Sequence, residues 1–226
     1  MRSSLYSLAA AAALTLAAAP AFGQVTVGAP ADAGTGNCYP FNCYGQVGYT
    51  EYQQVYAASA FSGPLTINSI NFFNTQYLPG TALFSGNTFQ IRFSETSLAP
   101  GGLSSTFSSN IGSNNVVFFN GILSGAATAV IYGTPYAYDG TDNLLMDVLV
   151  SGTNSCADYS ACGFLDVNSS GSVMSRVWGN GNAAGEGLVT EFNGGTTVTP
   201  EPATLALLGT GLLGSGLVRR RRNKTA

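Results

Sequence analysis

The sequence predicts an all-β chain: an antiparallel β-sandwich, of jelly-roll type, between a signal peptide and a carboxyl-terminal transmembrane helix. Three observations predict this fold class. Short runs of alternating apolar and polar residues fill the middle of the chain, glycine-rich turns separate most of them, and no stretch there shows sustained helical periodicity. Many short strands joined by such turns are typical of sandwiches and jelly rolls.

The clearest strand is 88–93, in which Phe89, Ile91 and Phe93 alternate with polar residues, the period of a half-buried strand. Turn residues such as Pro100-Gly101-Gly102 and Gly179-Asn180-Gly181 lie between the runs. The other predicted strands are 65–73, 116–123, 127–132, 144–150, 173–178 and 188–192.

The first 23 residues have the composition of a secretory signal peptide. Arg2 precedes an apolar stretch at 8–19, and small residues follow at Ala19, Ala21 and Gly23. Cleavage is expected after Ala21 or Gly23. A permanent membrane helix is the weaker alternative, because the apolar stretch is short and has small residues where a peptidase cuts, so the folded domain is expected at 24–199.

The last 27 residues, 200–226, combine a short polar signal, an apolar run and a basic cluster. The apolar run 203–218 holds no charge, and as a helix it would rise about 24 Å, slightly short of the hydrocarbon core. Four glycines within it make a helix of a soluble domain the weaker alternative. The basic cluster is expected to stay in the cytoplasm, with the domain outside. The signal residues are Pro200, Glu201, Pro202, Arg219, Arg220, Arg221 and Arg222.

These three elements, in this order at the carboxyl end, resemble the PEP-CTERM sorting signal of Gram-negative bacteria. The same tail has also been labelled an ice-binding protein C-terminal motif, a label that implies no ice activity. The resemblance implies that an exosortase-type transpeptidase cuts a temporary inner-membrane anchor, and that the mature protein ends near Pro200. The cell surface or the extracellular matrix is then the expected destination. Segments 52–56 and 143–148 also resemble extracellular β-sandwich domains found before such tails, without implying site residues.

The expected domain is strongly acidic. Residues 24–199 contain two basic residues, Arg92 and Arg176, against ten acidic ones, a net charge of −8. Such a surface repels nucleic acid and anionic lipid, because phosphate binding needs clustered lysine and arginine. It suits cations, neutral sugars, or solubility outside the cell.

Four cysteines are expected to form two disulfides after export. Three pairings are open, and the short loops Cys38–Cys43 and Cys156–Cys162 are favoured. A metal site is disfavoured, because the chain has no histidine and neither pair has the two-residue gap of a zinc knuckle.

Catalytic candidates are few. The absence of histidine removes every mechanism that uses an imidazole base. Paired carboxylates remain an option for a glycosidase, although solvated surface positions are the commoner role of such residues. The glutamates concerned are Glu51, Glu95, Glu186 and Glu191.

Two further kinds of binding site have candidates. Asp139-Gly140-Thr141-Asp142 has oxygen ligands suited to calcium, although an Asp-Gly turn is commoner. Most of the aromatic residues are expected to pack in the sandwich. Tyr136, Tyr138 and Trp178, beside turn residues, are the candidates for exposed rings that stack on sugars.

Two functions follow from these observations. The first is a non-enzymatic cell-surface or matrix protein, sorted by its tail and associated with exopolysaccharide or biofilm. The alternative is a polysaccharide-active enzyme that uses two carboxylates.

Overall fold

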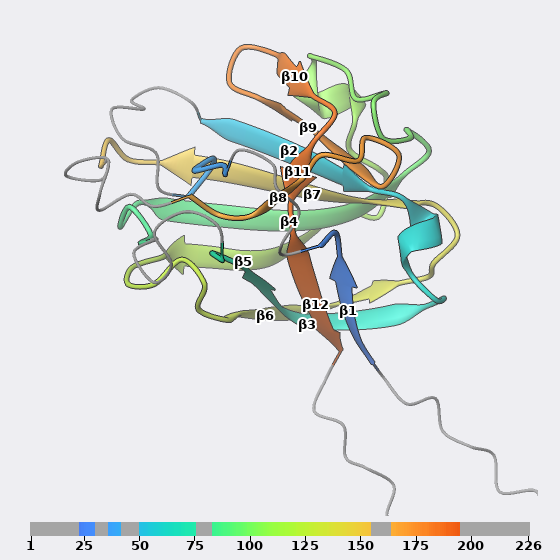
Figure 1. Cartoon of the computed structure of the whole chain (residues 1–226), viewed down its shortest axis with the longest axis horizontal. Helices are drawn as coiled ribbons and strands as arrows, with labels where there is room; N and C mark the ends of the chain where they lie inside the picture. The colour runs from blue at the N-terminus through green and yellow to red at the C-terminus, as the bar shows by residue number, and fades with distance from the viewer. Residues whose placement is uncertain (1–22, 30–35, 42–49, 76–82, 155–163, 195–226) are drawn as a thin grey trace, which may run out of the picture. The chain divides into compact units, whose positions relative to one another are not determined.

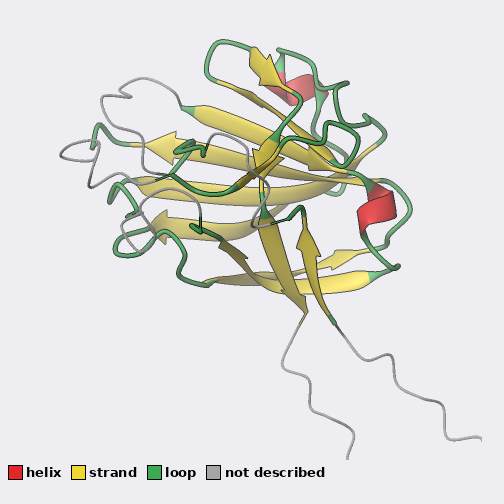
Figure 2. Cartoon of the chain, viewed as in Figure 1, coloured by secondary structure: helices red, strands yellow, loops and turns green. Residues whose placement is uncertain are grey.

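The computed structural model describes residues 23–29, 36–41, 50–75, 83–154 and 164–194. The strands belong to one compact unit, Phe22–Gly195. The signal peptide and the carboxyl-terminal tail lie outside the described residues. Figure 2 shows that strands dominate the described part and that its helical content is two short turns, η1 (Ala58–Ala60) and η2 (Phe107–Ser109). Neither turn is long and apolar enough to cross a membrane.

The described strands form two large antiparallel sheets and one small one. One large sheet has four strands in the order β1-β12-β3-β6, and the other has six in the order β10-β9-β2-β7-β4-β5 (Figure 1). Strands β8 and β11 form the two-stranded sheet. The bounds are β1 Gln24–Val27, β2 Glu51–Tyr56, β3 Leu65–Phe72, β4 Thr88–Thr96, β5 Val116–Ile122, β6 Ile131–Tyr138, β7 Asn143–Ser151, β8 Val167–Asn168, β9 Met174–Trp178, β10 Asn182–Ala184, β11 Gly187–Leu188 and β12 Thr190–Gly194.

Aromatic rings join the two large sheets. Phe93 on β4 lies 5.7 Å from the ring of Tyr136 on β6 and 6.2 Å from that of Phe192 on β12. Tyr56 on β2 meets the same Phe192 ring at 5.0 Å. These side chains are buried, so the core lies between the sheets and excludes water from a continuous apolar layer. The prediction of an all-β chain is confirmed.

The alternation predicted for 88–93 is confirmed on β4. Phe89, Ile91 and Phe93 are fully buried, while Gln90 and Arg92 between them are only partly buried. Successive side chains of a strand point to opposite faces, so β4 has one apolar inner face and one polar outer face.

The prediction for 127–132 is wrong in its bounds, because β6 begins at Ile131 and continues to Tyr138. Pro135 therefore lies within the strand. β6 is the last strand of its sheet, where a proline without an N–H is tolerated. The pairing of β6 with β3 also changes register between Ile67 and Ser69 of β3. This irregularity accommodates the extra residues that β6 has at this point.

A buried glutamine fixes the small sheet to the large one. The Gln54 side chain donates to the Leu188 carbonyl oxygen at 2.9 Å and accepts from the Leu188 N–H at 2.7 Å. Buried backbone groups need such partners, because an unpaired one loses its hydrogen bond to water. The Gln54 side chain therefore makes the hydrogen bonds to β11 that the backbone of a neighbouring strand would otherwise make.

Candidate functional site

A polar cluster lies on the outer face of the six-stranded sheet, across its central strands. Arg92 on β4 and Gln53 on β2 each pair in register with Asp147 on β7. Asp147 lies between the core residues Met146 and Val148, so its side chain points away from the core. One acidic, one basic and one amide side chain therefore meet on three adjacent strands.

Glu51 completes this cluster, which we call the outer-face cluster: Glu51, Gln53, Arg92 and Asp147. The Arg92 guanidinium forms an ion pair with Asp147, and its Nη2 lies 3.8 Å from Glu51 Oε1. Asp147 is buried, whereas the side chains of Arg92 and Glu51 are 19% and 22% exposed. The cluster is therefore covered on the Asp147 side and reaches water on the Glu51 side.

The segment between β4 and β5 covers the buried part of the cluster. Gln53 Nε2 donates to the Phe107 carbonyl oxygen at 3.1 Å, and Asn110 Nδ2 donates to Gln53 Oε1 at 2.7 Å. Both partners lie on or beside η2. The amide of Gln53 therefore attaches this segment to the sheet.

The carboxyl groups of Glu51 and Asp147 lie beside the same Arg92 guanidinium, and each of them shifts the pKa of the other. Burial raises the pKa of Glu51, the neighbouring Asp147 carboxyl group also raises it, and Arg92 opposes the shift, so the resulting pKa is about 7. Burial also raises the pKa of Asp147, against the lowering effect of Arg92. The Glu51–Asp147 pair therefore retains one proton up to about neutral pH.

This pair does not have the geometry of a glycosidase. Retaining enzymes separate their carboxyl groups by roughly 5 to 5.5 Å and inverting enzymes by roughly 6.5 to 9.5 Å, because the scissile bond lies between them. Glu51 and Asp147 instead both approach the Arg92 guanidinium, and Asp147 is buried, so a sugar cannot reach both carboxyl groups.

The other glutamates lie in separate local contacts. Glu95 accepts from the Asp139 N–H at 3.0 Å, Glu186 pairs with Arg176, and Glu191 accepts from Asn193 Nδ2 at 3.2 Å. The four glutamates considered from the sequence are thus dispersed. Only Glu51 has a carboxylate partner across adjacent strands, an arrangement that spacing along the chain did not reveal.

The Asp139–Asp142 segment forms a turn. Asp139 Oδ1 accepts from the N–H of Thr141 at 2.7 Å and from its hydroxyl at 2.6 Å. In the part of the chain that the structure describes, no group of three or more acidic or cysteine side chains is placed to hold a metal ion. Calcium binding here stays a prediction.

The expectation that Tyr136 and Tyr138 are exposed is wrong. Both are buried on β6, because the strand continues past Pro135, and the Tyr138 hydroxyl donates to the Asp142 carbonyl oxygen at 2.7 Å. Neither ring can stack on a sugar. The most exposed large aromatic or aliphatic side chain among the described residues is instead Tyr132, at 73%.

Trp178 is half-buried at the end of β9. The guanidinium carbon of Arg176 lies 4.6 Å from the centre of the Trp178 ring, and the Tyr39 ring lies 5.9 Å away. Arg176 therefore covers one face of the indole in a cation–π contact. A sugar would have to displace it to stack on that face.

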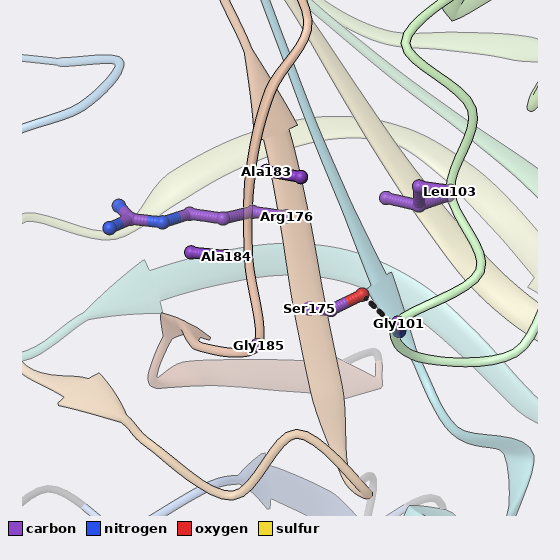
Figure 3. A pocket seen from close by; sticks show the side chains of 7 residues that line it. All are labelled: Gly101, Leu103, Ser175, Arg176, Ala183, Ala184 and Gly185. Carbon is purple, nitrogen blue, oxygen red and sulfur yellow. Dashed lines mark hydrogen bonds between the residues drawn. The ribbon is translucent and has the colours of Figure 1, made fainter.

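A cavity of about 160 Å³ lies between the start of the β4–β5 segment and the β9–β10 hairpin. Figure 3 shows the Arg176 side chain pointing away from Leu103. The Ser175 hydroxyl accepts from the Gly101 N–H at 2.7 Å. The cavity is smaller than the roughly 300 Å³ of a typical ligand pocket.

Cys38 is disulfide-bonded. The other three cysteines lie outside the described residues, so the pairing stays a prediction. The same holds for the sorting residues Pro200, Glu201 and Pro202 and for the arginines at 219–222, whose geometry the structure does not describe.

Comparison with known proteins identifies the tail alone. The family model of the PEP-CTERM protein-sorting motif matches residues 198–222. No curated protein and no solved structure gives a significant match to the chain. The resemblance inferred from the tail is therefore confirmed: the chain carries a PEP-CTERM sorting motif, the mark of an exported protein that an exosortase system sorts.

Proposed function

We propose that this protein is a non-enzymatic component of the cell surface or the extracellular matrix, and that its domain associates with exopolysaccharide. The observation that carries the proposal is the PEP-CTERM motif at 198–222, which marks an exported substrate of an exosortase-type system. In this account the apolar run 203–218 anchors the chain in the inner membrane only until the tail is cut. The domain then leaves with a new carboxyl end near Pro200.

The non-enzymatic role is supported by the chemistry of the domain. The sequence has no histidine to act as a base, and in the carboxyl pair Glu51–Asp147 the Asp147 side chain is buried beside Arg92, where a substrate does not reach it. Incubation of the domain with exopolysaccharide from its host should release no reducing ends. Release that disappears in Glu51→Gln would instead support the enzymatic alternative.

The charge of the domain supports a neutral glycan partner. With a net charge of −8 over residues 24–199, the domain repels anionic polymers at low ionic strength. A pull-down should therefore retain the domain on neutral exopolysaccharide and not on an anionic one. Failure to bind any host glycan would leave a purely structural role.

We also propose that the sandwich is a jelly roll with one added hairpin. Eight strands remain when β8 to β11 are set aside. Numbered in chain order, these eight strands form one sheet in the order 1-8-3-6 and a second sheet in the order 2-7-4-5. Strands β9 and β10 extend the second sheet at its β2 edge. Two interlocked four-stranded sheets of this kind are the arrangement of a jelly roll. An experimental structure with these strand orders would support the assignment.

The sorting claim is tested by replacing the signal residues one at a time. Glu201→Gln should leave the tail uncut, because it changes the central residue of the Pro-Glu-Pro signal. Glu191→Gln, which makes the same change on β12, is the matched control and should mature normally. Normal maturation of Glu201→Gln would show that the exosortase-type enzyme does not recognise the acidic residue of the signal.

A further inference from the structure

The outer face of the four-stranded sheet carries a row of polar side chains that crosses all four strands. The neighbouring row belongs to the core, because Phe192 on β12 pairs with Ile70 on β3, which pairs with Ile131 on β6, and all three are buried. Successive side chains of a strand point to opposite faces, so the next residue on each strand points outward. These outward residues pair with one another in register: Gln24, Asn193, Ser69 and Tyr132.

A second outward row lies beside the first. Thr26 on β1 pairs with Glu191 on β12, and Glu191 pairs with Asn71 on β3. Asn193 joins the two rows, since its Nδ2 donates to Asn71 Oδ1 and to Glu191 Oε1, both at 3.2 Å. We call the two rows together the polar face.

The polar face is open, whereas the outer face of the six-stranded sheet is covered. Val55 and Leu145 pair with each other on the outward side of β2 and β7, yet both are fully buried. On the polar face Tyr132 is 73% exposed, and Gln24 and Thr26 are exposed as well. A large polymer can therefore reach the polar face without displacing part of the domain.

The polar face has little charge, although the domain is strongly acidic. The strands that form it contain one acidic residue, Glu191, and no basic residue. Its amide and hydroxyl groups both donate and accept hydrogen bonds, as the hydroxyl groups of a sugar do. Tyr132 adds an exposed flat ring of the kind that stacks on sugar rings. A protein interface usually has a more apolar centre than these two rows provide.

We propose that the polar face is the glycan-binding surface of this protein and that its ligand is a neutral polysaccharide. This inference rests on the proposed association with exopolysaccharide and assigns that association to one surface. Tyr132 stacks on a sugar ring, while Gln24, Asn71 and Asn193 hydrogen-bond to sugar hydroxyls. Neighbouring strands lie about 4.8 Å apart, so the row from Gln24 to Tyr132 extends over about 14 Å, longer than a single sugar ring. An anionic polymer finds no basic side chain there.

Nuclear magnetic resonance tests which surface is used. Mature protein is purified from its host in ¹⁵N-labelled form and titrated with exopolysaccharide from that host, a neutral β-glucan, a galactomannan, dextran and anionic alginate. A neutral polymer that binds should shift the side-chain amide signals of Gln24, Asn71 and Asn193. Shifts confined to other regions, such as β9 around Trp178, would overturn the assignment of the surface but not the association with glycan.

Two other outcomes of this titration bear on the ligand. Binding to alginate alone would overturn the neutral ligand. Failure of the protein to bind any of the polymers, including the host exopolysaccharide, would overturn both the polar face as a site and the proposed function.

Affinity electrophoresis in gels that contain the bound polymer tests the energetics. Tyr132→Ala should raise the dissociation constant at least about tenfold, because the stacked ring is lost. Tyr132→Phe keeps the ring and should stay within about threefold of the wild type. Ile122→Ala is the matched control, since it removes a side chain that is 68% exposed on β5 of the other sheet, and it should stay within about twofold.

Unchanged affinity in Tyr132→Ala, or an equal loss in Ile122→Ala, would overturn the proposal. Thermal melting checks that the variants fold, and Tyr132→Ala should melt near the wild type because the side chain is largely exposed. If it melts early, the amide shifts of the wild-type protein decide, since they need no substitution.

Discussion

Arg92 forms an ion pair with the buried carboxyl group of Asp147 on the outer face of the six-stranded sheet, and the Glu51 carboxyl group lies 3.8 Å from the same guanidinium. Three ionisable groups thus share a site with limited access to water. One positive charge is close to two acidic groups, so the site is best balanced when one of the carboxyl groups holds a proton. This balance makes the stability of the domain depend on both Glu51 and Arg92.

The stability of the domain should depend on pH through Glu51. Its pKa is raised from the ordinary value of 4.5 to about 7 in the folded state, so the folded protein holds the extra proton between these values. Stability should therefore fall as pH rises through this window, and the raised pKa of Asp147 acts in the same direction. Glu51→Gln should remove this part of the slope and add about 1 to 2 kcal/mol at pH 8, allowing for partial solvent screening.

Urea unfolding at several pH values measures this effect. Glu191→Gln, the matched control on β12, should keep the slope of the wild type between pH 4.5 and 7. If Glu51→Gln unfolds with the same pH dependence as the wild type, then the Glu51 carboxyl does not hold the proton.

Removal of Arg92 should be costly because it leaves a buried carboxylate without its cation. We expect Arg92→Met to lower the free energy of unfolding by about 2 to 4 kcal/mol at pH 8. Asp147→Asn in the same chain removes the charge that Arg92 balanced, so the double variant should lose less than the sum of the single ones. Additive losses in this double-mutant cycle would show that the two residues do not interact.

The Gln54 amide should be needed for the packing of β11. Gln54→Met keeps the size of the side chain but leaves the N–H and carbonyl of Leu188 without their partner. The expected loss is about 2 to 4 kcal/mol. The control is Gln90→Met, at a partly buried position on β4, which should change the free energy of unfolding by less than about 1 kcal/mol. Comparable losses in the two variants would contradict the role of Gln54.

Gly133 should tolerate no side chain. A Cβ there would lie 2.4 Å from the Phe118 carbonyl oxygen and 2.7 Å from the Phe118 ring. Gly133→Ala should therefore cost about 1 to 3 kcal/mol through overpacking. Gly185→Ala is the control, since the nearest atom to its Cβ would be 3.8 Å away. Equal melting temperatures for both variants would show that β5 and β6 separate easily.

The sequence predicted the all-β fold class because strand alternation is a local signal. Phe89, Ile91 and Phe93 show this on β4, where each apolar residue lies in the core. The extent of β6 was not predictable in the same way. The predicted strand ended at residue 132, whereas β6 continues through Pro135, and the position of β6 at the edge of its sheet makes that proline compatible with a strand.

The candidate site depends on pairing between strands, which the sequence does not display. Glu51 and Asp147 are far apart in the chain and meet because β2 pairs with β7 in one particular register. The burial of Tyr136 and Tyr138 depends in the same way on the course of β6. The sorting motif, by contrast, is a linear signal, so residues 198–222 could be recognised without a structure.

The most direct test of the central claim, sorting by a removable tail, is mass spectrometry of the mature protein isolated from its native host. The proposed route predicts an amino end after Ala21 or Gly23, a carboxyl end near Pro200, and no peptide from 203–218. A mature protein that retains its chain through Ala226 would contradict removal of the tail and would make the apolar run a permanent part of the protein.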